Sequence, residues 1–217
     1  MAGGMGKRLG NITKSTPKPA IKINKIPFII YLINWLKKNG FKKFYFLISF
    51  KKIKLEKILF DYFKENKNLK YKTFTEKKRC GTYGALMDNI NKFEEKFFYT
   101  NADEIAKLDI YKMYKKFLKS KTNVMSSVIK TSNGNLSLNR KKKIVSLVGE
   151  EKFNDCGYKF IARKTFKKRE KKYTKVEDFL YQDYIKKNDI SYYELNELPL
   201  RIDTANDIKR TKIKIKK

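Results

Sequence analysis

Histidine is absent from this chain of 217 residues, and cysteine occurs only twice. A chain without histidine cannot form a His-based catalytic triad or a His-ligated metal site. Cys80 and Cys156 stand too far apart in the sequence to form a metal-binding pair, and two cysteines are too few for a disulfide scaffold. Because so few cysteines suit a reducing compartment, we expect a cytoplasmic protein.

Acidic residues are scarce: 22 aspartates and glutamates face 53 lysines and arginines, which gives a net charge of +31. Such a charge suggests nucleic-acid binding. However, only 7 of the basic residues are arginine, the better reader of nucleic-acid grooves. The lysines are spread along the whole chain, apart from a dense tail at residues 209–217. We therefore interpret them mainly as a solvated surface that helps to bind anionic ligands, with nucleic acid or a membrane surface as alternative partners.

Long apolar runs are also lacking. None reaches the roughly 18 residues that a membrane-spanning helix needs, and the N-terminus has no apolar signal core. Hydrophobic residues nevertheless make up 41% of the chain and aromatic residues 14%, too many for a disordered basic tail. The length fits one α/β domain, so we expect a single domain over residues 1–217 that ends in the basic tail.

Apolar patterning predicts alternating strands and helices, whereas residues 1–19, rich in glycine and proline, are expected to form a loop. Helices are predicted at Pro27–Asn39, Ile53–Phe63, from the Gly81–Gly84 loop to Asn91, from Asp109 to Leu118, at Val176–Lys187 and from Asp203 onward. Strands are predicted at Phe44–Phe50, Tyr71–Phe74, Lys96–Thr100, Val124–Ile129, Ile144–Val148, Tyr158–Ala162 and Ser191–Leu195. This alternation predicts an α/β fold with a mainly parallel sheet, helices on both faces, and ligands at the carboxyl ends of the strands.

The first motif is the glycine-rich run Gly3-Gly4-Met5-Gly6-Lys7-Arg8, which Pro17-Lys18-Pro19 follows. Glycines let backbone N–H groups approach a polyphosphate closely, and Arg8 and Lys18 can neutralise charge on a transferred phosphorus and its leaving group. A glycine-rich turn alone is weak evidence. The run does not fit the P-loop or the dinucleotide-binding spacing, and its combination with Pro-Lys-Pro is more specific.

Two aspartates follow predicted strands and are candidates for binding a hard cation. Asp103 ends the segment Asn101-Ala102-Asp103 after an apolar strand, and Asp203 lies in Arg201-Ile202-Asp203. The alternatives are an Asx turn for Asp103 and a helix N-cap for Asp203. Together with Arg8 and Lys18, the two carboxylates would form a site for Mg²⁺ and a nucleotide.

Two further segments are candidates for ligand binding. In Gly81-Thr82-Tyr83-Gly84, backbone groups could read a planar base. Lys152 could hold a second phosphate, and Gly157 could leave room for a sugar ring. Each segment by itself is also explained by packing and turn formation.

Taken in this order, the motifs resemble those of the sugar-1-phosphate nucleotidyltransferase family. The resemblance rests on Gly3–Leu9, Pro17–Pro19, Pro27-Phe28, Gly81–Leu86, Asn101–Asp103, Glu151-Lys152, Asp155–Gly157 and Ile202-Asp203. It covers nearly the whole chain and is strongest to small single-domain members such as the heptose 1-phosphate guanylyltransferases. It implies a single Rossmann-like domain that joins a nucleoside triphosphate to a sugar 1-phosphate and releases pyrophosphate.

The resemblance also implies roles for individual residues. Arg8 and Lys18 would serve the reacting phosphates as catalytic residues, and Asp103 and Asp203 would hold Mg²⁺. The nucleotide would be bound by Gly3, Gly4, Gly6, Gly81 and Thr82. The sugar phosphate would be bound by Lys152 and Gly157. Nucleic acid is an unlikely partner on this interpretation, and the oligomeric state is left open.

Several departures from the family pattern keep alternatives open. Lys7 stands where threonine is usual, Ala102 where glycine is usual, and Asp155 where asparagine or threonine is usual. Asp203–Asp207 is closer to cytidylyltransferase relatives, so a cytidylyltransferase for a phospho-alcohol is one alternative. A non-catalytic, basic nucleic-acid-binding protein on a decayed enzyme fold is another. The family's buried first strand is expected directly before Ala2, and we therefore expect that strand to be encoded upstream of Met1.

Overall fold

The structure, a computed structural model, describes residues 1–2, 6–49, 52–76, 80–134, 136–138, 144–146, 152–167, 172–185, 187 and 189–215. The chain forms two compact units. The first holds Met1–Arg79, Asn101–Ala106 and Pro199–Lys217, and the second holds Cys80–Thr100 and Lys107–Leu198. The chain passes from one unit to the other after residues 79, 100, 106 and 198, so neither unit is a continuous stretch of sequence.

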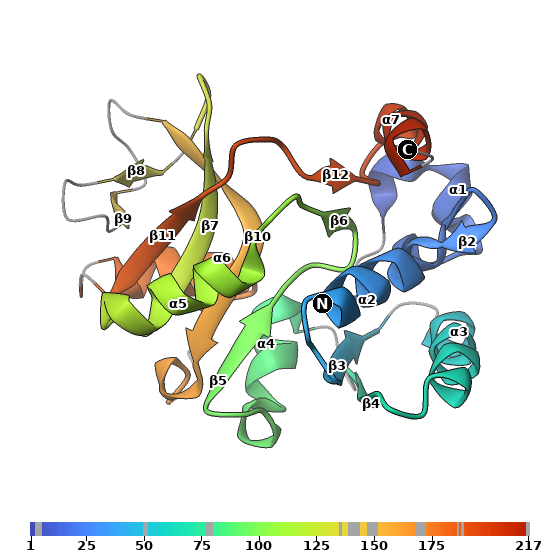
Figure 1. Cartoon of the computed structure of the whole chain (residues 1–217), viewed down its shortest axis with the longest axis horizontal. Coiled ribbons are helices and arrows are strands. Elements are labelled where there is room, and N and C mark those ends of the chain that lie inside the picture. The colour runs from blue at the N-terminus through green and yellow to red at the C-terminus, as the bar shows by residue number, and fades with distance from the viewer. Residues whose placement is uncertain are drawn as a thin grey trace. The chain divides into compact units, whose positions relative to one another are not determined.

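The first unit is built from short strands and helices that come from both ends of the chain (Figure 1). Its helices are η1 (Lys7–Leu9), α1 (Asn11–Lys14), η2 (Lys18–Ala20), α2 (Phe28–Lys38), α3 (Lys52–Glu65) and α7 (Ala205–Ile215). Its strands are β1 (Lys22–Ile23), β2 (Ile26–Pro27), β3 (Lys43–Ile48), β4 (Lys70–Thr75), β6 (Glu104–Ile105) and β12 (Leu200–Arg201).

Helix α2 forms as its sequence predicts. Pro27 precedes its first residue, and the buried residues Phe28, Ile29, Leu32, Ile33 and Leu36 share one face. At its end Gly40 adopts φ +88°, a backbone conformation that favours glycine. The Gly40 N–H donates to the Lys37 carbonyl (3.0 Å) and the Phe41 N–H to the Leu36 carbonyl (3.2 Å), the pattern of a Schellman motif.

Strands β3 and β4 pair in parallel over six residue pairs from Lys43–Lys70 to Ile48–Thr75, and α3 forms the crossover between them. The Phe63 ring of α3 stacks on the Tyr71 ring of β4, with centroids 4.2 Å apart. The chain's first residues extend this unit: the Ala2 N–H donates to the Leu47 carbonyl and the Ala102 N–H donates to the Met1 carbonyl, both at 2.9 Å. Met1 and Ala2 therefore connect β3 to the segment that carries Asp103.

The second unit is built around a four-stranded sheet with the order β11-β7-β10-β5. Its strands are β5 (Lys96–Tyr99), β7 (Val124–Lys130), β8 (Ser137–Leu138), β9 (Ile144–Ser146), β10 (Phe153–Ala162) and β11 (Ile190–Glu194). Its helices are α4 (Gly81–Met87), η3 (Ile90–Lys92), α5 (Ile110–Ser120), η4 (Arg163–Thr165), α6 (Val176–Phe179) and the π-helical η5 (Leu180–Tyr184).

Helices cover both faces of this sheet. On one face the Phe117 ring of α5 stacks on the Phe160 ring of β10, with centroids 5.8 Å apart. On the other face the Tyr181 hydroxyl of η5 lies 3.0 Å from the Ser126 hydroxyl of β7. Successive residues of a strand point to opposite faces, which explains why β7 is buried on both.

The α/β architecture predicted from the sequence is confirmed. Parallel pairing occurs between β3 and β4 and between β7 and β11, and β10 adds antiparallel pairing to β7 and to β5. Some boundaries differ from the prediction. β10 begins at residue 153 rather than 158, and the helix predicted at 176–187 continues as a π-helical turn that ends at Tyr184.

Two predictions near the N-terminus and the Gly81 loop were wrong. Residues 1–19 are not a plain loop, because η1, α1 and the start of η2 lie there. The helix predicted to follow the Gly81–Gly84 loop begins at Gly81 itself and ends at Met87. In the part of the chain that the structure describes, no helix is long and apolar enough to cross a membrane.

Candidate functional site

Asp103 and Asp203, which are 100 positions apart in the sequence, are brought together by the short ladder of β6 and β12. The two strands pair antiparallel, with Glu104 opposite Arg201. The Ile202 N–H continues the ladder by donating to the Asp103 carbonyl at 3.1 Å. Ile202 is fully buried in an apolar cluster with Leu9, Ile21, Ile23, Phe28 and Ile208, which fixes this end of the ladder.

An ion pair between two side chains of the same ladder stabilises it. The Arg201 Nε lies 3.1 Å from the Glu104 carboxylate, and the Glu104 side chain is 7% exposed. The Thr211 hydroxyl of α7 donates to the Arg201 carbonyl at 2.8 Å. These contacts hold both aspartates on a rigid support.

Asp203 was considered as a helix N-cap, and this interpretation was wrong. α7 begins at Ala205, and Thr204 caps it: the Thr204 hydroxyl oxygen accepts from the Asp207 N–H at 3.1 Å. The Asp207 carboxylate in turn accepts from the Thr204 N–H at 3.0 Å, which completes a capping box. The Asp203 carboxylate is therefore available for other contacts.

Lys18 lies between the two aspartates. Its Nζ donates to the Asp103 Oδ2 at 2.5 Å and also to the Asp203 Oδ1. The Lys18 side chain is only 9% exposed, and this burial alone would lower its pKa. The two carboxylates outweigh burial and raise the pKa of Lys18 above its usual value, so the side chain stays a cation.

Asp203 shows the reciprocal effect. Burial alone would raise the pKa of its carboxyl group, but the hydrogen bond and charge of Lys18, with a smaller contribution from Arg8, lower it below its ordinary value. The Arg8 Nη1 lies 3.9 Å from the Asp203 Oδ2, and the Arg8 side chain is 75% exposed. Arg8 thus lies at the edge of the aspartate pair with most of its guanidinium open to a ligand.

The backbone that precedes Arg8 packs closely against Thr13. Gly6 has φ +62°, and a Cβ there would lie 2.8 Å from the Thr13 Cγ2. The Thr13 hydroxyl donates to the Gly6 carbonyl at 3.0 Å. Gly3 and Gly4, the other predicted nucleotide-binding glycines, lie outside the described residues.

Asp103 and Asp203 are the candidate ligands for a divalent cation. Two carboxylates from separate segments converge on a single positive charge, the ammonium group of Lys18, and oxygen ligands are those that Mg²⁺ prefers. Among the described residues, no group of three or more His, Cys, Asp or Glu side chains could hold a metal ion. A cation bound by Asp103 and Asp203 would therefore need further oxygens from a ligand or from water.

In the second unit, the predicted base-reading residues make contacts with the start of α6. A Cβ on Gly81, whose φ is +71°, would lie 2.2 Å from the Thr174 carbonyl oxygen. The Thr82 hydroxyl oxygen accepts from the Val176 N–H at 3.1 Å, and the Tyr83 N–H donates to the Thr174 carbonyl at 3.1 Å. Packing alone thus accounts for a glycine at 81.

The predicted sugar-phosphate residues lie on and beside β10. Lys152 is exposed, and its carbonyl accepts from the Thr131 N–H at 3.0 Å. Gly157 has φ +78° and lies in a β-bulge between Asp155 and Lys159. The Gly157 N–H donates to the Asp155 Oδ1 at 2.6 Å. Glu151, which precedes Lys152 in the family motif, lies outside the described residues.

Sequence reasoning missed the partners of Lys159. This lysine follows Gly157 by two positions, is fully buried, and pairs with Asp155 and Glu177. A charged residue inside the apolar run Tyr158–Ala162 was the available signal, because a lysine buried in a strand needs a carboxylate partner.

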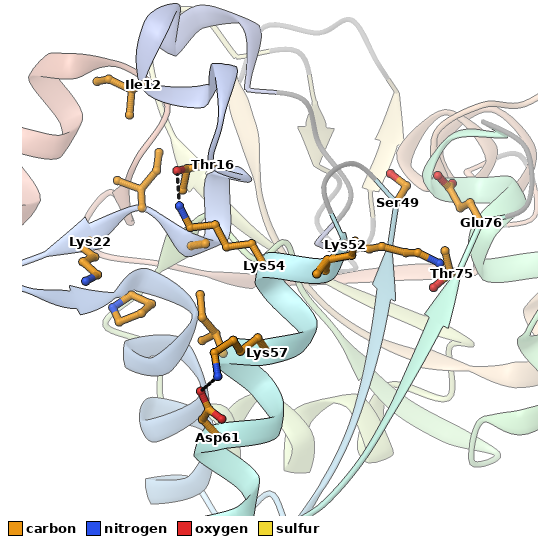
Figure 2. Close-up of a pocket in the computed structure, with 15 residues that line it drawn as sticks. Ile12, Thr16, Lys22, Ser49, Lys52, Lys54, Lys57, Asp61, Thr75 and Glu76 are labelled. Atoms are coloured by element: carbon orange, nitrogen blue, oxygen red, sulfur yellow. Dashed lines mark hydrogen bonds and ion pairs between the residues drawn. The ribbon is translucent and has the colours of Figure 1, made fainter.

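A separate groove of about 1010 Å³ lies in the first unit. Ser49, Thr75 and Glu76 line one part of it, at the carboxyl ends of β3 and β4, and Figure 2 shows Lys54 hydrogen-bonded to Thr16 in another part. Among the described residues, the lysines that line the groove are Lys22, Lys52, Lys54 and Lys57. None of the predicted site residues that the structure describes lines it, so the groove and the aspartate pair are distinct features.

Comparison with known proteins decides the family. Residues 1–138 match the Nucleotidyl transferase family. The chain belongs to this family. It is 32% identical over 114 residues to the D-glycero-α-D-manno-heptose 1-phosphate guanylyltransferase of Campylobacter jejuni, which covers 52% of this chain and 50% of that protein. It is 30% identical over 162 residues to the bifunctional protein GlmU of Methanococcus vannielii, covering 74% of this chain and 36% of that protein.

The fold is that of solved nucleotidyltransferase structures. HddC from Yersinia pseudotuberculosis superposes with a TM-score of 0.76 at 22% identity, covering 99% of this chain and 96% of that one. A glucose-1-phosphate thymidylyltransferase of Bacillus anthracis superposes with a TM-score of 0.82 at 17% identity, covering 98% and 92%. In sequence, the chain matches half or less of the length of the two curated relatives described above.

Proposed function

We propose that this member of the family transfers a nucleotidyl group from a nucleoside triphosphate to a sugar 1-phosphate. The observation that carries the proposal is the position of Lys18 between Asp103 and Asp203, with Arg8 at the edge of the pair. An oxygen of the sugar phosphate attacks the α-phosphorus, the bond from that phosphorus to the oxygen bridging to the β-phosphate breaks, and pyrophosphate leaves.

The charges of the aspartate pair fit this reaction. Asp103 and Asp203 would hold Mg²⁺, which neutralises the triphosphate and polarises the attacked phosphoryl group. Lys18 brings a cation that burial keeps in a fixed position, and it would contact the reacting phosphates. The exposed Arg8 guanidinium would bind two phosphate oxygens at once and stabilise charge on the leaving pyrophosphate.

The remaining predicted residues complete the proposal. Gly3, Gly4 and Gly6 would bring backbone N–H groups to the triphosphate, while Gly81 and Thr82 would face the base. Lys152 and Gly157 would bind the sugar phosphate. Cys80 and Cys156 are free cysteines, which suit a reducing compartment, and we therefore propose a cytoplasmic location.

The second candidate is a cytidylyltransferase that acts on a phospho-alcohol. It is favoured by a 35% identical match over 65 residues to the choline-phosphate cytidylyltransferase of Streptococcus pneumoniae, which covers 30% of this chain and 26% of that protein. The two candidates share the nucleotide chemistry and differ in the acceptor. Acceptor choice therefore distinguishes them.

Pyrophosphate release with a panel of substrates tests both candidates. The panel combines ATP, GTP, CTP, UTP and dTTP with D-glycero-α-D-manno-heptose 1-phosphate, glucose 1-phosphate and choline phosphate, each with Mg²⁺. We expect turnover with at least one sugar 1-phosphate. Turnover with choline phosphate and CTP alone would favour the second candidate, and no pyrophosphate release with any pair would overturn both.

Asp103→Asn links any activity to the proposed site. The variant keeps the size of the side chain and removes one of the two carboxylates, so we expect turnover to fall at least about 100-fold with the fold intact. Asp61→Asn is the matched control, because Asp61 is an exposed aspartate of α3 that pairs with Lys57. Normal Mg²⁺-dependent turnover of Asp103→Asn would reject the metal assignment.

A further inference from the structure

A buried charge cluster in the second unit is not used by the chemistry above. The Lys159 side chain is fully buried, and its Nζ lies 2.7 Å from the Asp155 Oδ2 and 3.3 Å from the Glu177 Oε1. The Tyr99 ring lies on another side, with its centroid 5.7 Å from the Nζ. One ammonium group thus joins two carboxylates, one from β10 and one from α6.

Both carboxylate oxygens of Asp155 make contacts within the protein. Its Oδ1 accepts from the Gly157 N–H at 2.6 Å, and its Oδ2 accepts from the Tyr181 hydroxyl at 2.5 Å as well as from Lys159. Burial, with the charge of Asp155, raises the pKa of Tyr181 well above its ordinary value, so Tyr181 remains a donor. The side chain of Asp155 is 16% exposed. Asp155 therefore fixes the bulge at Gly157 rather than facing a ligand.

Glu177 is different. Its Oε1 accepts from Lys159, whereas its second carboxylate oxygen has no hydrogen-bond donor among the described residues. The Glu177 side chain is 27% exposed. One oxygen is thus held toward Lys159, and the other is an oriented acceptor that a ligand can reach.

We propose that Glu177, oriented by Lys159, accepts a hydrogen bond from a hydroxyl group of the phosphate acceptor and thereby selects a polyhydroxylated acceptor. This inference rests on the proposed function and adds a specificity residue to it. The contacts run from Glu177 of α6 through Lys159 and Asp155 to the Gly157 N–H, so they connect this carboxylate to the part of β10 that is proposed to bind the sugar phosphate. Lys159 acts through Glu177 and is a positioning residue.

The chemistry favours a hydroxyl group over a quaternary ammonium group as the ligand of Glu177. A carboxylate accepts hydrogen bonds strongly, and a sugar hydroxyl donates one. A quaternary ammonium group would gain less, because the Lys159 ammonium group already partly neutralises Glu177. The same ammonium group already lies over the Tyr99 ring, the kind of aromatic surface that binds a quaternary ammonium group. A hydroxyl donor still gains from the open oxygen.

Glu177→Gln is the central variant. The amide oxygen would stay on the Lys159 ammonium, which places the NH₂ group where the open oxygen was, so a hydroxyl donor loses its acceptor. We expect KM for the sugar 1-phosphate that the wild type uses in the panel to rise at least about 10-fold, the effect of 1.4 kcal/mol. KM for the nucleoside triphosphate should stay within about twofold.

Asp178→Asn is the matched control on the same turn of α6, and both KM values should match the wild type. An unchanged sugar-phosphate KM in Glu177→Gln would overturn the inference while leaving the proposed function in place. Preference of the wild type for choline phosphate over both sugar phosphates would also overturn it. If no pair in the panel releases pyrophosphate, the proposed function fails and the inference fails with it.

Lys159 needs a second variant, because Lys159→Met alone leaves two carboxylates without their cation and is expected to unfold at a lower temperature. Lys159→Met combined with Glu177→Gln removes one of those charges. If Lys159 acts through Glu177, the double variant has the same sugar-phosphate KM as Glu177→Gln alone. A further rise of about 10-fold in the folded double variant would show that Lys159 acts independently and would overturn its positioning role.

Discussion

Thr204 and Asp207 cap helix α7 reciprocally, and this pair is what leaves Asp203 facing Lys18. The Asp207 N–H donates to the Thr204 hydroxyl oxygen at 3.1 Å, and the Thr204 N–H donates to the Asp207 carboxylate at 3.0 Å. Asp203 precedes the cap and directs its carboxylate at the Lys18 ammonium. Helix capping and site geometry are therefore coupled at adjacent residues.

The first prediction concerns this cap. Thr204→Val keeps the shape of the side chain and removes the hydroxyl group that accepts from Asp207. We expect the free energy of unfolding to fall by about 1 kcal/mol, the usual cost of a lost N-cap. Urea denaturation measures it. Thr204→Ser, which keeps the hydroxyl group, is the control and should stay within about 0.5 kcal/mol of the wild type.

The second prediction separates Lys18 and Arg8 from ordinary surface lysines. Lys18→Ala should lower turnover at least about 10-fold, and Arg8→Lys should do the same, because a point charge cannot replace a bidentate guanidinium group. Lys14→Ala, at an exposed position of α1, is the control. Initial rates of pyrophosphate release within about twofold of the wild type for both variants would return Arg8 and Lys18 to the status of structural charges.

Lys18→Ala has a second expected result that does not depend on activity. Without the ammonium group, Asp103 and Asp203 face each other with uncompensated charge, and a divalent cation should replace it. Mg²⁺ should therefore raise the thermal midpoint of the variant more than that of the wild type. Equal shifts in the two proteins would show that Lys18 and the cation do not compete for the aspartate pair, and the absence of a shift in both proteins would count against the metal assignment.

The sequence predicted the elements whose signals are long and periodic. The apolar face of α2 extends over several turns, and Gly40 marks the end of the helix. The structure confirms both. The pairing of β6 with β12 could not be predicted from the sequence, because each strand is two residues long and too short to show any periodicity. The convergence of Asp103 and Asp203 was expected from their places after predicted strands, but the ladder that causes it was not.

The cap and the buried lysine show a different limit. Asp203 and Thr204 are adjacent, and both residue types favour the N-cap position, so only the spacing from Thr204 to Asp207 distinguishes them. Lys159 sits in a strand where its neighbours are buried, yet its partner Glu177 comes from a helix 18 positions away. The cap is thus decided by a local spacing of three residues, whereas the contact between Lys159 and Glu177 joins two elements, and local patterns do not encode such a contact.

The third prediction is a dependence of stability on pH. The pKa of Asp203 in the folded state is below its ordinary value of 3.8, since Lys18 outweighs burial, so the ionised carboxylate favours folding. That stabilisation is present above pH 3.8 and is lost as the pH falls further. The pKa of Lys18 is raised above 10.5, so its contribution is present below that pH and is lost as the pH rises through the folded-state value.

Thermal unfolding of the wild type and Asp203→Asn across pH checks this. We expect the difference between their midpoints to be constant from about pH 5 to pH 9 and to shrink below 3.8, where the carboxyl group of the wild type becomes protonated. A difference that persists unchanged at about pH 2.5 would show that Asp203 stabilises the fold through packing rather than through its charge.

The last prediction concerns Gly81, where the demands of the fold and of the proposed nucleotide site meet. A Cβ at this position would lie 2.2 Å from the Thr174 carbonyl oxygen, which is backbone, and φ is +71°. The added Cβ and the Thr174 carbonyl oxygen can separate only if the backbone at the start of α6 shifts. We therefore expect Gly81→Ala to lower the free energy of unfolding by about 3 kcal/mol. Gly40→Ala is the matched control: φ is +88° there, and no heavy atom lies within 4 Å of the added Cβ. That variant carries the backbone strain alone, about 1 kcal/mol. Equal losses of unfolding free energy in the two variants would mean that the Thr174 segment moves easily. Packing would then not explain the glycine at 81, and the proposed contact with the nucleotide would be the remaining explanation.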